Sequence, residues 1–146
     1  MLGISHLVAG AAIGAAVPDR GTRTASVLAS HVLLDFIGHD DHTVSPVTQG
    51  ALAIGGIAVL ASTWGARSAV VEAALVSALP DLEVLVDVAL GRRFSHYLFP
   101  SHWQFRRTRG SHPYRLPGRT VHIRAEVAAA ITVLAALAVL GIGRRR

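Results

Sequence analysis

The sequence contains no cysteine and no lysine, and it has few charged or aromatic residues. Without cysteine, the chain cannot form a disulfide, bind a metal through thiolates or use a cysteine nucleophile. Charged residues make up 16% of the 146 residues, whereas typical soluble domains have about 25%. Hydrophobic residues make up 51%, mostly Ala, Val and Leu, and Gly is abundant. This composition indicates an α-helical membrane protein whose helices pack closely through small residues.

Long uninterrupted apolar runs are also missing, since no segment has the roughly 20 residues of a standard spanning helix. Five shorter apolar segments predict helices, at residues 2–17, 24–38, 51–64, 68–90 and 127–143. No sustained alternation of apolar and polar residues is present, so we expect no sheet. The predicted fold is all-α: one domain over residues 1–146, an integral membrane bundle of four to five helices. It is expected to cross the cell membrane several times, with membrane lipid as its partner.

The basic residues are unevenly distributed, although the formal net charge is only +5. Residues 92–124 contain eight arginines and no acid, and three more arginines end the chain. Such clusters can face nucleic acid, anionic lipid or the cytoplasm. In a chain this apolar, lipid and cytoplasm are favoured, and no nucleic-acid partner is expected. The interleaved aromatic residues would suit base stacking, but they suit a membrane interface equally well.

Residues 30–42 place three histidines and three aspartates in an otherwise apolar part of the chain. His31, Asp35 and His39 follow one another at intervals of four residues. On a helix, four residues turn by roughly 400°, so these side chains would share one face within an arc of about 80°. Thr24 or Ser26 is expected to cap that helix. Imidazole and carboxylate groups projecting to one point are suitable ligands for a divalent metal ion.

Three other segments carry ionisable groups among apolar residues: His6, the pair Asp81 and Glu83, and His102. Taken singly, each has an ordinary explanation, such as a packed histidine, a helix start at a proline, or a polar loop. Together, they require partners, because ionisable side chains in apolar helices are costly unless satisfied. One shared metal ion, or two, would satisfy them, and so would a metal-free cluster of His–Asp pairs. We therefore predict that the side chains of His31, Asp35 and Asp81 converge.

The order of these motifs resembles a bacterial family of predicted membrane-bound metal-dependent hydrolases, itself similar in pattern to zinc-dependent phospholipase C. The resemblance covers about residues 3–112 and rests on His6, on Ser30-His31-Val32-Leu33-Leu34-Asp35 and on Leu79-Pro80-Asp81-Leu82-Glu83. Two departures are clear. Glu83 and Val84 stand where the family has Asp and His, and the Ser-His-x-x-x-Asp helix precedes the Leu-Pro-Asp motif instead of following it.

The resemblance implies a hydrolase that uses a divalent metal, expected to be zinc, on a phosphoester, with lipid-linked phosphoesters included. Zinc would lower the pKa of a bound water and so provide the nucleophile. The expected metal ligands are His31, Asp35, Asp81 and His102, followed by His6 and His39. A general base is expected at Glu83 or Asp40. The expected phosphate-binding residues are Arg106, Arg107 and Arg109.

Three alternatives remain open from the sequence. The first is a non-catalytic small membrane protein whose polar or metal cluster fixes helix packing. The second is a lipid phosphatase of the Pro-Ser-Gly-His type, which Pro100-Ser101-His102 faintly resembles, although the glycine is missing. The third is nucleic-acid binding by the arginine-rich segment. Geometry separates the first from an enzyme, because a catalytic site keeps an open, water-accessible coordination position.

Overall fold

The computed structural model describes residues 3–39, 46–91, 94–102 and 120–144. Five helices make up most of this part of the chain: α1 (Gly3–Ala16), α2 (Arg20–Asp35), α3 (Pro46–Trp64), α4 (Ala69–Ala89) and α5 (Ile123–Gly143). A short 3-10 helix, η2, covers Pro100–His102. The strands β1 (Gly38–His39) and β2 (Thr120–Val121) pair in parallel. The predicted helical bundle is confirmed, whereas the expectation of no sheet was wrong by this one short pairing.

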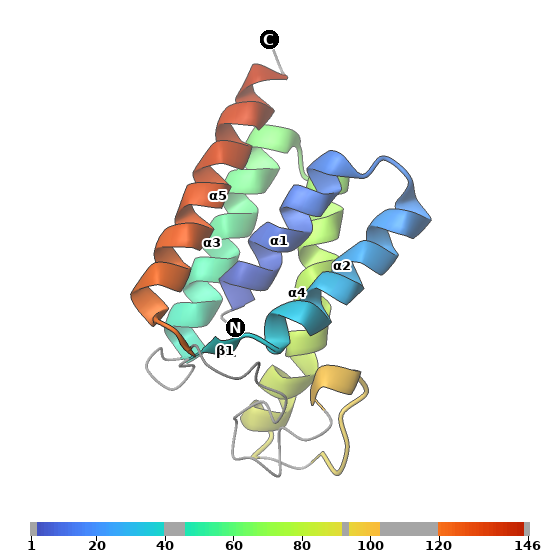
Figure 1. The fold of residues 1–146 in the computed structure, drawn as a ribbon, viewed down its shortest axis with the longest axis vertical. Coiled ribbons are helices and arrows are strands. Elements are labelled where there is room, and N and C mark those ends of the chain that lie inside the picture. The colour runs from blue at the N-terminus through green and yellow to red at the C-terminus, as the bar shows by residue number, and fades with distance from the viewer. Residues whose placement is uncertain (1–2, 40–45, 92–93, 103–119, 145–146) are drawn as a thin grey trace.

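Helix α1 lies at the centre of the bundle and contacts each of the other four helices. Figure 1 shows α3 and α5 side by side along one flank, with α2 on the opposite side of α1. The core lies where α1, α3, α4 and α5 meet. Its buried apolar residues are Ile4, Leu7, Val8, Ala11, Leu60, Val70, Val71, Ala74, Ala130 and Leu137. Helix α4 packs closely against α1, and this contact sets the distance between the segments that carry the ionisable groups.

Small residues allow the close approach of α1 and α4. A Cβ atom added at Gly10 would lie 2.5 Å from the Cβ of Ser77 and 2.6 Å from the carbonyl oxygen of Ala73. One turn later, a Cβ at Gly14 would lie 2.7 Å from the carbonyl oxygen of Ala69. Glycines four residues apart on one helix face therefore bring the two backbones together, as in closely packed membrane helices.

Helix α2 has different ends from those predicted. It begins at Arg20 with Asp19 as its N-cap, whose side chain accepts a 2.7 Å hydrogen bond from the backbone N–H of Thr22. It ends at Asp35, and the chain then becomes extended and pairs through β1 with β2. The predicted caps at Thr24 and Ser26 were therefore wrong. So was the prediction that His39 continues the helical face, because His39 lies in β1.

In the part of the chain that the structure describes, two helices are long and apolar enough to cross a membrane, over Val47–Trp64 in α3 and Arg124–Gly143 in α5. They are tied together where α3 ends: the indole Nε1 of Trp64 donates a 2.8 Å hydrogen bond to the carbonyl oxygen of Leu137. The guanidinium of Arg144 lies 4.9 Å from the centre of the Trp64 ring. Both helices expose large apolar side chains, among them Val47, Ile54, Val59, Ile131, Val133, Val139, Leu140 and Ile142.

Candidate metal centre

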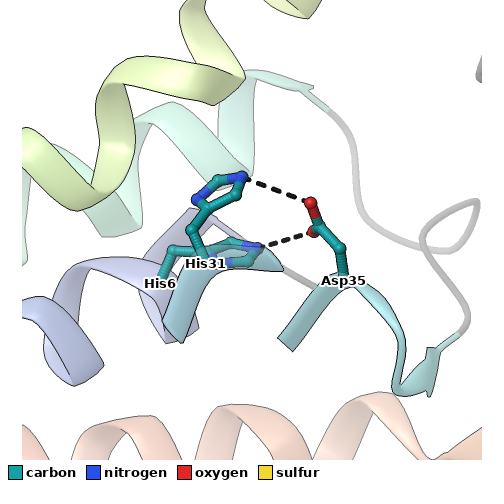
Figure 2. Close-up of side chains that lie close together, drawn as sticks. All are labelled: His6, His31 and Asp35. Atoms are coloured by element: carbon teal, nitrogen blue, oxygen red, sulfur yellow. Dashed lines mark ion pairs between the residues drawn. The ribbon is translucent and has the colours of Figure 1, made fainter. Parts of the chain in front are cut away.

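Five of the six predicted metal ligands meet at one end of the bundle. They come from four elements: His6 from α1, His31 and Asp35 from α2, Asp81 from α4, and His102 from η2. Figure 2 shows the imidazole rings of His6 and His31 facing the carboxylate of Asp35. These groups are deeply buried, with exposed fractions of 0% for both histidines and 3% for Asp35. The predicted convergence of His31, Asp35 and Asp81 is confirmed. It was inferred from the energetic cost of placing isolated ionisable side chains in apolar helices.

The imidazole rings of three histidines lie close to the two carboxylate oxygens of Asp35. The Nε2 atom of His6 lies 3.2 Å from Oδ1, whereas the Nε2 atoms of His31 and His102 lie 3.3 and 3.5 Å from Oδ2. The hydroxyl of Ser101 also donates a hydrogen bond to Oδ2. Burial acts to raise the pKa of the Asp35 carboxyl, but the close approach of the imidazoles of His102, His31 and His6 outweighs burial and holds the pKa far below its usual range. The three imidazoles therefore favour the ionised form of Asp35, although this residue is buried.

Asp81 closes the cluster from the side of α4. Its Oδ1 lies 3.7 Å from the Nε2 of His31 and 3.8 Å from the Nε2 of His102. Two sets of donors result, each with its atoms within 4.8 Å of one another: His6 with His31 and Asp35, and His31 with Asp81 and His102. His31 belongs to both sets, so it is the central donor of the cluster.

Each of two imidazoles is held at its Nδ1 atom, which leaves its Nε2 atom facing the carboxylates. The Nδ1 of His31 lies 2.8 Å from the carbonyl oxygen of Ser77, which can only accept, so this nitrogen carries the proton. The Nδ1 of His102 lies 2.9 Å from Oε1 of Glu83. Carbonyl or carboxylate partners at the far nitrogen are what fix the tautomer of metal-binding histidines. Ser77 also joins α4 to α1, because its hydroxyl donates a 2.6 Å hydrogen bond to the carbonyl oxygen of His6.

Electrostatics around His102 differ from those of an isolated buried histidine. Burial lowers the pKa of its imidazole, but hydrogen bonds to Asp35 and Glu83, together with the charge of Asp81, outweigh burial and raise the pKa above its usual value. The carboxylates of Asp35, Glu83 and Asp81 thus make the surroundings of His102 negative, which favours a cation near its Nε2 atom.

Several buried polar atoms of the cluster make no hydrogen bond among the described residues: Nδ1 and Nε2 of His6, Nε2 of His31 and Oδ2 of Asp81. Leaving a buried donor or acceptor unsatisfied costs about 1–3 kcal/mol. Nε2 of His6 lies 3.2 Å from a carboxylate oxygen of Asp35, and Nε2 of His31 lies 3.3 Å from Asp35 and 3.7 Å from Asp81. The ligand atoms of each donor set lie within 4.8 Å of one another, which is an arrangement that suits a shared cation.

The remaining predicted residues have different positions. Glu83 is engaged through both oxygens, because Oε2 accepts from the backbone N–H of Leu98 and Oε1 from that of Phe99, besides the contact with His102. Its predicted role as a general base stays a prediction. Asp40, Arg106, Arg107 and Arg109 lie outside the described residues, as does the side chain of His39. Their proposed roles also stay predictions.

Sequence reasoning missed the polar residues that support the cluster, namely Ser77, Asp87, Tyr97 and Ser101. A signal was available for two of them. Ser77 lies one helical turn before Asp81, on the same face of a helix, and Ser101 directly precedes His102. A further buried pair joins α1 to α5, where the hydroxyl of Ser5, next to His6, donates a 2.6 Å hydrogen bond to Glu126.

No protein-family model matches the chain, and no curated protein or solved structure matches it either. The function must therefore be inferred from the geometry and chemistry of the cluster itself.

Proposed function

We propose that the protein is a membrane-bound, metal-dependent hydrolase and that the His/Asp cluster holds its divalent ion. One observation carries this proposal: buried imidazole nitrogens without hydrogen bonds share their space with the carboxylates of Asp35 and Asp81. A metal-free cluster would leave those nitrogens unsatisfied, at a cost of about 1–3 kcal/mol for each. A cation satisfies them all at once, and it neutralises the buried carboxylates as well.

The donor set favours zinc among divalent ions. A site made of imidazole nitrogens and carboxylate oxygens, without thiolates, suits Zn²⁺. Such a site also accepts Fe²⁺, Mn²⁺ or Ni²⁺, for which it is less selective. An all-oxygen site, as preferred by Mg²⁺ or Ca²⁺, is not what these residues offer. His31 would be the common ligand, because its Nε2 belongs to both sets of donors while its Nδ1 is bound to Ser77.

An enzyme is favoured over a purely structural centre because the cluster is covered unequally. His6, His31, Asp35 and His102 have exposed fractions of 0 to 3%, whereas the side chain of Asp81 is 36% exposed. A structural site is closed on all sides, but a catalytic one keeps a face open to water. A divalent ion bound there can supply a nucleophile from water at neutral pH. Asp81 would border the open face, where a phosphoester substrate enters.

Membrane placement is supported by α3 and α5. Their spans contain 18 and 20 residues, which correspond to about 27 and 30 Å of helix and match a hydrocarbon core of about 30 Å. Apolar side chains face outward on both helices, as they do in contact with lipid. The cluster lies toward the end at which α3 and α5 begin (Figure 1). The site would therefore lie near one membrane surface, within reach of a lipid-linked phosphoester.

The decisive experiment measures metal content and hydrolysis together in detergent-purified protein. Elemental analysis should find close to stoichiometric zinc in the wild type and at least tenfold less in His31→Ala. His96→Ala is the matched control, because His96 is exposed and its ring is hydrogen-bonded to the neighbouring Ser95, away from the cluster residues. Hydrolysis of bis(p-nitrophenyl) phosphate should depend on the bound metal. Metal without hydrolysis would support the non-catalytic alternative, and no metal in the wild type would refute the centre.

A further inference from the structure

The residues 94–102 form an arm that brings His102 to the cluster, and α4 holds this arm at two successive turns. The first holding point is Glu83, which accepts hydrogen bonds of 2.6 and 3.0 Å from the backbone N–H groups of Leu98 and Phe99. The second is Asp87, four residues later and on the same face of the helix. Both side chains accept hydrogen bonds from the arm.

Asp87 is a fully buried carboxylate, with an exposed fraction of 0%, and it is outside the metal cluster. Its Oδ1 accepts a 2.7 Å hydrogen bond from the backbone N–H of Phe94, where the described arm begins. Its Oδ2 accepts from the phenolic hydroxyl of Tyr97, whose side chain is also buried. Burying a carboxylate costs several kcal/mol unless hydrogen bonds compensate. The two hydrogen bonds from the arm therefore offset part of the cost of burying Asp87.

The arm ends among the ligands. After Tyr97, Phe99 packs edge-on against His31 with ring centres 5.0 Å apart, and Ser101 donates a hydrogen bond to Asp35. The ring of Tyr97 lies 6.2 Å from that of His102. A shift of the arm on α4 would therefore move His102 relative to its partners on α2 and α4.

We propose that Asp87 and Tyr97 are positioning residues: their hydrogen bond fixes the arm on α4 and so keeps His102 at the cluster. The consequence for metal binding rests on the proposed function, but the placement of His102 does not. Outer partners of metal ligands typically contribute 10- to 100-fold to metal affinity. Tyr97→Phe removes only the hydroxyl and leaves the ring that packs near His102.

Two measurements on the full chain in detergent test the proposal. The first is the rate at which diethyl pyrocarbonate modifies His102 in metal-free protein, followed by mass spectrometry. Because His102 is 1% exposed, this rate is low while the arm is fixed. The second is the rate at which bound Co²⁺ dissociates into excess EDTA, followed through the visible absorption of the ion. Trp64→Phe is the matched control, because it also removes one hydrogen bond of an aromatic side chain, which is part-buried and lies at the opposite end of the bundle.

Tyr97→Phe should raise both rates at least tenfold, whereas Trp64→Phe should leave both within twofold of wild type. Unchanged modification of His102 in Tyr97→Phe would overturn the proposal, as would an equal increase in Trp64→Phe. If modification accelerates but Co²⁺ dissociation does not, the arm does not position a metal ligand and the proposal fails in that respect. If the wild type binds no Co²⁺, the proposed function fails, and the modification rates alone decide whether Asp87 and Tyr97 position His102.

Discussion

The Nδ1 atom of His31 donates a hydrogen bond of 2.8 Å to the carbonyl oxygen of Ser77, 46 residues later in the chain. This contact joins α2 to α4 and fixes which nitrogen of His31 is available to a cation. It occurs just before Pro80, which lies inside α4 and cannot donate a hydrogen bond to the carbonyl group of Val76.

Replacing Gly10 on α1 by even the next larger residue should disturb the packing of the helices, because Gly10 packs against the same residue, Ser77. In Gly10→Ala the new methyl group would meet backbone atoms of α4 and the Cβ of Ser77 at about 2.5 Å, so the helices must separate. Overpacking of this kind costs about 1–3 kcal/mol. We expect a lower free energy of unfolding in detergent. We also expect a lower zinc content, because displacement of Ser77 also displaces His31, which is hydrogen-bonded to its carbonyl oxygen.

Gly55→Ala is the matched control for this substitution. Gly55 also lies inside a helix, α3, but nothing lies within 4 Å of an added Cβ. Replacing glycine by alanine in a helix then stabilises by up to about 1 kcal/mol. Equal effects of the two substitutions on unfolding would contradict close packing of α1 and α4 at Gly10.

His6→Phe distinguishes a ligand from a packed ring. The ring of His6 stacks on that of His31 with centres 3.9 Å apart, so phenylalanine preserves the shape and the stacking. It removes both unsatisfied nitrogens, which should leave the metal-free protein as stable as the wild type or more so. We expect at least tenfold weaker zinc binding by competition with a chelating dye. Unchanged zinc affinity would show that His6 only packs.

Local pattern was enough to predict the helices and most of the cluster. The apolar segments predicted the helices from local pattern alone, and His31 and Asp35 lie one turn apart on α2. The cost of isolated ionisable groups then predicted that Asp81 would join them. That inference needed no knowledge of how the chain folds between the segments.

The parts that were wrong depend on contacts between distant segments. Helix α2 stops at Asp35 although apolar residues follow, since Gly38 and His39 pair with Thr120 and Val121 of β2. No sequence pattern within residues 30–42 predicts that pairing. The double engagement of Glu83 also escaped prediction, because its partners are backbone N–H groups of an arm whose path the sequence does not specify.

Metal removal should destabilise the wild type but not a variant that lacks the central carboxylate. A ligand present at 100 times its dissociation constant stabilises the folded state by about 2.7 kcal/mol. We therefore expect zinc to raise, and EDTA to lower, the unfolding temperature of the wild type, whereas Asp35→Asn should not respond. Asp19→Asn is the control and should respond fully, because Asp19 only caps α2 and asparagine caps equally well. A wild type that ignores both additions would argue against a bound ion.

Trp64 should report the depth of the bundle in a bilayer. It lies at the end of α3, where the indole N–H binds the backbone of α5 and the guanidinium of Arg144 covers the ring. Tryptophan and arginine together favour the headgroup region, where a ring can be half apolar and a cation can stay hydrated. In a Trp103→Phe background, which leaves Trp64 as the single tryptophan, lipids brominated near the headgroup should quench its fluorescence most strongly. Stronger quenching by bromines near the chain ends would place this end of α3 in the bilayer centre and contradict the proposed spans. Quenching by iodide in the aqueous phase, with no effect of any brominated lipid, would contradict membrane insertion of α3 and α5.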